Sequence, residues 1–380
     1  MRNTGEKRIQ GFITSFCTIA FAVFSFTFVA MYKSPVFEVV YDSVATGKLQ
    51  FNAYVVAGVI TTVLVGLALW LNRFAKFQRE WTAMAFLPSA LLLAFLTDID
   101  RTFFVGGKSY TLWMWILATG VVVYLFFSFV LKRILFEKIK NPTVVGNKIL
   151  WRNLILLAFF FFSVGCLSSG ESGFRYEAVQ YVRYMHGDVD AALAVGKSSP
   201  FSSRQLTAQR AFLLASVNRL GESFFEYPVA YGAEGMLPSV MRDAPIAPDS
   251  AYSLIGVPRG AEEKAVDYLS RAVSSDKAGS VARDYYLCSL LAERRIVDFS
   301  DAIFEYYRVS DALPKHYREA LVLYSYVTPE YSLPFDATES LKEIDDFITR
   351  LKRPDCGARC LAALFDDYGD TYWWYFLYGG

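Results

Sequence analysis

Long apolar runs dominate the first 168 residues, whereas the remainder shows shorter apolar stripes at helical spacing. A helix rises about 1.5 Å per residue, so roughly 20 apolar residues cross a hydrocarbon core of roughly 30 Å. Five runs reach or approach that length, at 12–32, 51–71, 81–97, 111–131 and 151–168. We therefore predict a transmembrane domain of about five helices over residues 1–168 and a second domain over residues 169–380.

The third run, 81–97, is the shortest and contains Pro88. It is interpreted either as a tilted span or as a half-span buried within protein. The first run resembles a signal peptide because basic residues precede it. Its length of about 20 residues exceeds the 7–15 of a signal h-region, so we predict a retained helix.

Beyond residue 173 the apolar residues follow the periodicity of amphipathic helices, with stripes that start near Phe174, Leu206, Ala261, Val281 and Pro314. No sustained alternation of period two occurs, which predicts an all-α protein without strands. Helix pairs of about 30–35 residues resemble tetratricopeptide-type repeats, with an irregular helical bundle as the alternative. Proline and glycine residues interrupt the pattern over 224–258 and predict a long ordered loop.

Charge divides the chain in the same place. Residues 1–168 hold 16 Lys/Arg and 7 Asp/Glu, whereas residues 169–380 hold 22 and 30. With a cytoplasmic N-terminus, segments 1–11, 72–80 and 132–148 carry 11 Lys/Arg, against 4 in segments 33–50 and 98–110. The positive-inside rule then predicts this orientation, and five spans place residues 169–380 outside the cytoplasm. The acidic second half excludes nucleic acid as a partner, since phosphate binding needs a cationic surface.

The five cysteines give weak signals. Cys17 and Cys166 lie in apolar runs and are interpreted as small hydrophobic residues. Cys356 and Cys360 are four residues apart, so they could face each other on one helix or pair in a loop, and an extracytoplasmic location would allow a disulfide between them. A single pair at this spacing favours unpaired thiols.

No pattern predicts catalysis, a cofactor or a metal site. The chain has two histidines, and the His316–Glu319 pair supplies too few ligands for zinc. Asp98, Asp100 and Arg101 follow the third apolar run at the membrane surface. They favour an ordinary polar loop with an ion pair over a cation site or polar pathway.

Two segments are candidates for binding. The run 220–235 mixes aromatic, acidic and glycine residues in a predicted loop, and such loops often carry binding residues. In the tail, six of the seven residues from 372 to 378 are aromatic. These aromatic residues either form an exposed partner surface or pack as a plug beneath the last helices. The candidate binding residues are Glu222, Phe225, Glu226, Tyr227, Tyr231, Glu234, Tyr372, Trp373 and Trp374.

Three short runs together carry a family resemblance: LGESFFEYP at 220–228, PKHYREA at 314–320 and GDTYWWY at 369–375. With membrane helices ahead of them, they resemble an uncharacterised family of Bacteroidetes integral membrane proteins with a tetratricopeptide-like C-terminal region. The resemblance covers mainly residues 174–380, and members often have more than five spans. It implies a bacterial inner membrane and a periplasmic helical domain, and it supplies no catalytic residues.

We therefore predict a protein anchored in the lipid bilayer that presents a periplasmic surface to a protein or peptide partner, in a scaffold or assembly role. The alternative is a membrane enzyme that acts on a lipid-linked or cell-envelope substrate at the outer membrane–water interface. That alternative requires Asp98, Asp100 and Arg101 to converge with the 222–235 loop.

Overall fold

A computed structural model gives the fold and describes residues 2–44, 50–75, 77, 79–105, 109–131, 146–168, 172–238, 248–260, 262–275, 279–308, 313–353 and 356–379. Every regular element in these ranges is helical, which confirms the predicted all-α class. The chain divides into two compact units, Met1–Arg175 and Tyr176–Gly380. Each unit is described by itself below.

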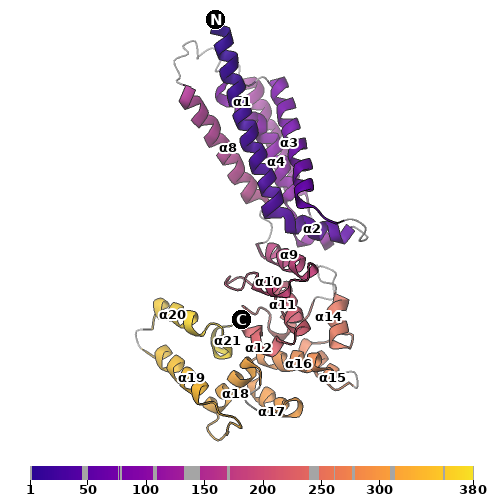
Figure 1. The fold of residues 1–380 in the computed structure, drawn as a ribbon, viewed down its shortest axis with the longest axis vertical. Coiled ribbons are helices and arrows are strands. Elements are labelled where there is room, and N and C mark those ends of the chain that lie inside the picture. Colours follow the sequence, from indigo (N-terminus) through magenta and orange to yellow (C-terminus); the bar gives the residue numbers. More distant parts are fainter. Residues whose placement is uncertain are drawn as a thin grey trace. The chain divides into compact units, whose positions relative to one another are not determined.

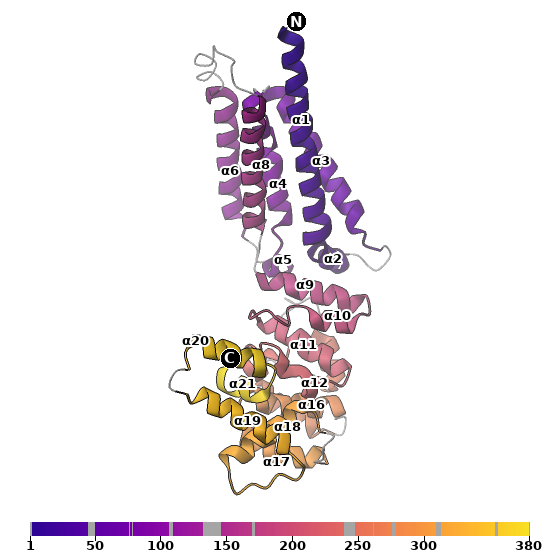
Figure 2. The same ribbon diagram turned by 60° about the vertical axis from the view of Figure 1, so that its left-hand side comes forward.

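The first unit contains four helices long and apolar enough to cross a membrane, at Arg8–Val44, Ala53–Ala75, Thr111–Phe129 and Lys148–Ser168. Its helices run side by side (Figures 1 and 2). Their bounds are α1 Arg2–Thr27, η1 Phe28–Lys33, α2 Ser34–Val44, α3 Ala53–Ala75, η2 Arg79–Phe86, α4 Leu87–Thr97, α5 Arg101–Val105, α6 Thr111–Leu125, η3 Phe126–Leu131 and α8 Gly146–Ser168. The basic segment 132–145 lies outside the described residues.

The third predicted run, 81–97, is shorter than the other four and is interrupted. A 3₁₀ segment, η2, with a kink at Trp81 leads into the α-helix α4, which has Pro88 in its first turn. Asn153 of α8 accepts a hydrogen bond from the Ala83 backbone N–H at 2.8 Å, and the Ser89 hydroxyl donates to the Leu64 carbonyl at 2.8 Å. Irregular backbone at membrane depth is tolerated only where protein satisfies it, and α3, α6 and α8 pack around this segment.

The first predicted run, 12–32, continues further than expected. After a π-helical segment, η1, the chain enters α2, which lies across the end of the bundle in Figure 1. Lys33 closes η1 in a buried position, and its ammonium group donates to the carbonyl oxygen of Ser168. The π-helical turn thus redirects the chain, and Lys33 remains hydrogen-bonded within the unit.

The second unit is a stack of short helices: α9 Ser172–Met185, α10 Val189–Ala194, α11 Arg204–Ser216, α12 Leu220–Ser223, η4 Phe224–Glu226, α13 Gly232–Gly235, α14 Pro248–Ile255, α15 Ala265–Val273, α16 Ser280–Ala292, α17 Ile296–Tyr306, α18 Lys315–Val327, α19 Thr338–Leu351, α20 Ala358–Tyr368 and α21 Tyr372–Tyr378. From α15 to α20 each helix packs against the next. The core contains several fully buried tyrosine and phenylalanine rings, including Tyr268, Tyr285, Phe299, Tyr317 and Phe347.

The predicted loop over 224–258 is more structured than its proline and glycine content suggests. It includes η4, α13 and α14, and α13 packs against α11, α15 and α16. Residues 239–247 lie outside the described residues. Tertiary packing therefore turns part of this segment into short helices whose isolated sequences have weak helical propensity.

Candidate functional site

The three motif runs, far apart in sequence, meet in the second unit. Phe225 of η4 lies at the centre, with ring-centroid distances of 5.1 Å to Tyr372, 4.7 Å to Tyr375 and 5.4 Å to His316. The first run also approaches the second at Gly221, where a Cβ atom would lie 2.5 Å from the Tyr317 ring. Glycine is therefore required where α12 crosses α18.

A buried carboxylate joins the second run to the third. Glu319 of α18 accepts a hydrogen bond from the backbone N–H of Tyr372 at 2.7 Å, and its contact with His316 Nδ1 is 2.9 Å. Both side chains are buried. Burying a carboxylate is costly unless it is hydrogen-bonded, so these two contacts allow Glu319 to fix the start of α21.

The aromatic tail is largely a plug, one of the two predicted arrangements. Tyr372, Trp373 and Tyr375 are buried. The Tyr372 hydroxyl donates to the Leu291 carbonyl at 3.1 Å, and the Tyr375 hydroxyl donates to the Ala292 carbonyl at 2.8 Å. These acceptors lie in the last turn of α16, where carbonyls lack the usual intrahelical partner, and the Leu291 carbonyl also accepts from the Arg294 backbone N–H at 3.0 Å. Burial raises the pKa of Tyr375 to about 12.

The outer side of the tail stays exposed and continues onto α20. Phe365 lies 5.4 Å from Trp374, and Trp374 lies 4.6 Å from Tyr378. Phe365, Leu377 and Tyr378 expose between 44% and 55% of their surface, and Trp374 is half-buried. We call these four residues, Phe365, Trp374, Leu377 and Tyr378, the aromatic patch.

The acids of the first run make structural contacts. Glu222 accepts a hydrogen bond from the backbone N–H of Lys315 at 2.7 Å, and Glu226 pairs with Lys197 at 2.6 Å. Tyr227 is buried against the Arg210 guanidinium, 4.9 Å from its ring centroid. Burial lowers the pKa of Arg210 to about 10. These contacts tie the 220–228 run to the turn that follows α10, to α11 and to α18.

Glu234 and Tyr231 lie near the start of α13. Glu234 accepts from Arg259 at 2.8 Å and from the Ala265 backbone N–H at 2.6 Å. Burial alone would raise its pKa, but the hydrogen bonds and the Arg259 charge outweigh burial and leave the pKa of Glu234 below its usual value. Tyr231 is 68% exposed in a left-handed conformation with φ 65°. Tyr231 and Glu222 are the two exposed residues of the predicted binding set.

The predicted interface cluster belongs to the first unit. Asp98 accepts a hydrogen bond from the Trp113 indole at 2.6 Å. Asp100 accepts from the Thr102 hydroxyl at 2.6 Å and from the Phe103 backbone N–H at 3.3 Å, as an N-cap for α5, which begins at Arg101. The two aspartates therefore organise the turn between α4 and α6. This cluster and the 222–235 loop lie in different units, each described separately.

A buried polar cluster escaped sequence reasoning. Asp284 of α16 accepts hydrogen bonds from the Tyr307 hydroxyl at 2.6 Å and the Tyr317 hydroxyl at 3.0 Å. Burial raises the pKa of Asp284, although both hydrogen bonds oppose that rise. Its position at i+3 from Val281 in an apolar stripe was the available signal, because a carboxylate on a buried helix face needs polar partners.

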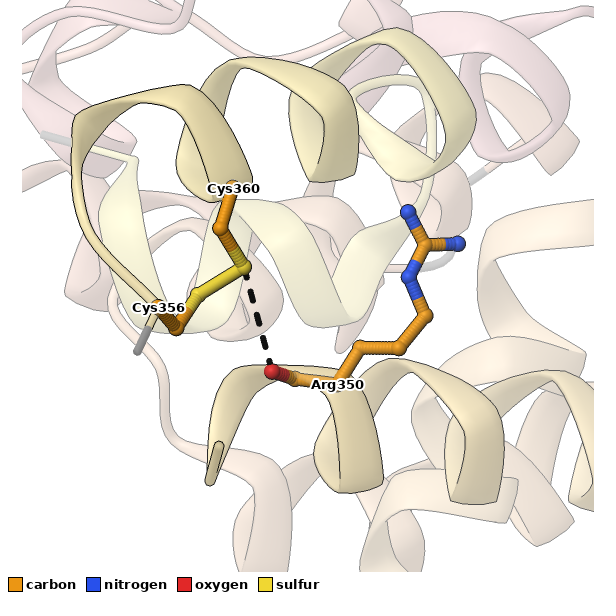
Figure 3. Close-up of a disulfide and its surroundings, with 3 residues drawn as sticks. All are labelled: Arg350, Cys356 and Cys360. Carbon is orange, nitrogen blue, oxygen red and sulfur yellow. Dashed lines mark hydrogen bonds between the residues drawn. A yellow bond between two sulfur atoms is a disulfide. The ribbon is translucent and has the colours of Figure 1, made fainter. Parts of the chain in front are cut away.

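The expectation that Cys356 and Cys360 are unpaired thiols is wrong. They form a disulfide with a Cα–Cα distance of 5.0 Å between Cys356, just before α20, and Cys360, in the first turn of α20 (Figure 3). The intervening loop, not one helix, brings the two sulfurs together. A spacing of four residues did not reveal that loop geometry.

Within the described residues, no group of three or more His, Cys, Asp or Glu side chains is arranged to hold a metal ion. The geometry provides an aromatic patch on a rigid, hydrogen-bonded base. Residues 257–379 match the "Family of unknown function (DUF6057)", which spans α15 to α21 and two of the three motif runs. Comparisons with curated proteins and with solved structures give no match.

Proposed function

We propose that this protein is a membrane-anchored interaction protein whose aromatic patch binds a protein or peptide partner. The observation that carries the proposal is the exposure of Phe365, Leu377 and Tyr378 beside Trp374 on α20 and α21. Exposed contiguous aromatic groups outside a membrane typically mark interaction sites. Tyrosine and tryptophan are also enriched in the residues that dominate binding energy.

The base beneath the patch supports this role. Glu319, His316 and Phe225 fix α21 from below, and the Tyr372 and Tyr375 hydroxyls bind the end of α16. A surface held rigidly before binding loses little conformational entropy when a partner docks.

We infer that the second unit lies outside the cytoplasm, in the periplasm of a bacterium whose inner membrane holds the first unit. Lys and Arg concentrate in the segments assigned to the cytoplasmic side, as the positive-inside rule requires. The Cys356–Cys360 disulfide is consistent with this location, because disulfides form most often in oxidising compartments. The family resemblance points to Bacteroidetes as the source.

We further infer a tetratricopeptide-like relationship for α15 to α20. Successive helices of 9 to 14 residues that each pack on the next are typical of helical repeat arrays. The array is modified because α12 and α21 both pack against α18. For the enzyme alternative, the contacts of Asp98 and Asp100 offer no specific support, so we do not advance it.

The test is site-directed photo-crosslinking of the full chain in its native membrane. A photoreactive residue replaces Tyr378 in the patch or, as a matched control, Phe304, which is 50% exposed on α17. The proposal expects a discrete adduct from position 378 that is lost in a Phe365→Ser background, and none from position 304. Equal labelling at both positions, or adducts with lipid alone at 378, would remove the proposal.

A further inference from the structure

The Cys356–Cys360 disulfide closes a very short loop, the five residues from Cys356 to Cys360. In the chain-entropy description, a disulfide stabilises a fold by restricting the unfolded chain, and that effect is smallest for short loops. The bond therefore contributes little to the stability of the segment that leads into α20. Its presence calls for another explanation.

Other contacts already hold α19 against α20. Arg350 pairs with Asp367 at 2.8 Å, and the Tyr368 hydroxyl donates to Asp346 at 2.7 Å. The rings of Phe347 and Tyr368 are 5.3 Å apart. Because these contacts do not involve the sulfurs, the pair of helices stays together when the disulfide opens.

The reduced form also has a place for its thiol. Cys360 Sγ lies 3.9 Å from the carbonyl oxygen of Arg350, along the dashed line in Figure 3. A disulfide sulfur carries no hydrogen, so this contact becomes a weak S–H···O hydrogen bond only after reduction. Both sulfur-bearing residues are half-buried, which leaves access for an attacking thiolate.

We propose that Cys356 and Cys360 form a reversible thiol–disulfide exchange site whose partner is a dithiol, of the class carried by extracytoplasmic oxidoreductases. A partner thiolate attacks Cys356 Sγ, the bond to Cys360 breaks, and Cys360 leaves as a thiolate that takes up a proton. The partner's second thiolate then attacks the mixed disulfide and releases Cys356, which is also protonated. The chain gains two electrons and two protons, and the partner's dithiol is oxidised to a disulfide. This exchange does not depend on the proposed partner surface, but the class of its partner rests on the proposed extracytoplasmic location.

The experiment exposes the purified full chain, folded in detergent, to dithiothreitol and then to a thiol-alkylating reagent. Peptide mass spectrometry reads modification at each cysteine, and circular dichroism reads the helical content. We expect complete labelling of Cys356 and Cys360 with unchanged helical content, and restoration of the disulfide by oxidised glutathione. Cys288, a fully buried thiol, serves as the internal control and should stay unlabelled.

Two results would overturn the proposal: a pair that is reduced only after the chain is denatured, or reduction that unfolds the second unit. Two single-cysteine variants test which of the two sulfurs the partner thiolate attacks first. Oxidised glutathione should form a mixed disulfide more readily at Cys356 in the Cys360→Ser variant than at Cys360 in the Cys356→Ser variant. Equal rates, or faster reaction at Cys360, would contradict the attack on Cys356.

Discussion

The two units satisfy their polar groups in different ways. In the membrane unit, side-chain hydroxyls mostly bond to carbonyls one turn back in the same helix, as Thr18 does to Thr14 at 2.8 Å and Ser163 to Phe159 at 2.8 Å. In the second unit, buried polar groups connect segments far apart in sequence, as Glu319 does with Tyr372. The membrane unit also has polar contacts between distant segments, such as Ala83 with Asn153, but the buried carboxylates that link helices, Glu319 and Asp284, belong to the second unit.

Their surfaces also differ. Valine, phenylalanine and tryptophan side chains cover the outward faces of α3, α6 and α8, where lipid is the expected neighbour. The second unit exposes fewer such side chains among its described residues, so the aromatic patch is an unusual surface there. On the first unit, exposed aromatic side chains are expected because lipid surrounds them. An exposed aromatic side chain therefore indicates contact with lipid in the first unit and a candidate interaction surface in the second.

The largest expected effect is loss of the plug in the second unit. Trp373→Ala removes the largest fully buried side chain and should lower the free energy of unfolding by about 3–5 kcal/mol. Chemical denaturation of the full chain in detergent measures this change. Tyr378→Ala, at the exposed patch, should cost no more than about 0.5 kcal/mol. Similar costs for both variants would show that the tail is not a plug.

A matched pair of substitutions tests the difference in surroundings. Val63 on α3 is 60% exposed and Val297 on α17 is 56% exposed. Val63→Asp should disfavour membrane insertion by about 2.5–3.5 kcal/mol, because the carboxylate enters hydrocarbon. Val297→Asp should change stability by less than about 0.5 kcal/mol. The inserted fraction and the denaturation midpoint report the two effects, and normal insertion of the Val63 variant would contradict a lipid-facing α3.

Helix packing in the membrane unit can be tested at glycine. A Cβ atom at Gly120 of α6 would lie 2.1 Å from Leu91 Cδ1 on α4, whereas a Cβ atom at Gly66 meets open space. Gly120→Leu should destabilise the unit by about 1–3 kcal/mol through overpacking. Gly66→Leu should be tolerated. Thermal unfolding in detergent compares the two variants. A larger loss of stability for Gly66→Leu than for Gly120→Leu would contradict the packing of α6 against α4.

The smallest effect concerns acid stability of the second unit. The Arg271 hydrogen bonds lower the pKa of Glu263 to about 2, whereas an unfolded glutamate titrates near about 4.3. Its contribution is therefore present above about pH 4.3 and is lost as the pH falls toward about 2. Because the pair is partly exposed and screened by solvent, we expect less than about 1 kcal/mol. Glu263→Gln should flatten this part of the stability–pH curve, and an unchanged curve would show that the pair contributes nothing.

Much of the fold was predictable from apolar spacing. The runs 51–71, 111–131 and 151–168 correspond to α3, α6 with η3, and α8, because length and hydrophobicity alone define a span. The stripes that start near Phe174, Leu206, Val281 and Pro314 correspond to α9, α11, α16 and α18. Amphipathic periodicity is sufficient for helices of that length.

The remainder depends on tertiary contacts. The meeting of Phe225, His316 and Tyr372 joins segments more than fifty residues apart, which no local pattern encodes. The turn of the chain at Lys33 depends on the Ser168 carbonyl, and the Cys356–Cys360 bond depends on the loop between α19 and α20. Propensity and periodicity describe single elements, so the sequence alone does not predict these contacts between distant segments.

Topology is the most direct test of the proposal that the first unit crosses a membrane and the second unit lies outside the cytoplasm. A reporter enzyme that is active only outside the cytoplasm is fused after residue 169 and, as a control, after residue 80. This account predicts activity for the fusion after residue 169 and none for the fusion after residue 80. An inactive reporter after residue 169, with the fusion protein present in the membrane, would contradict it.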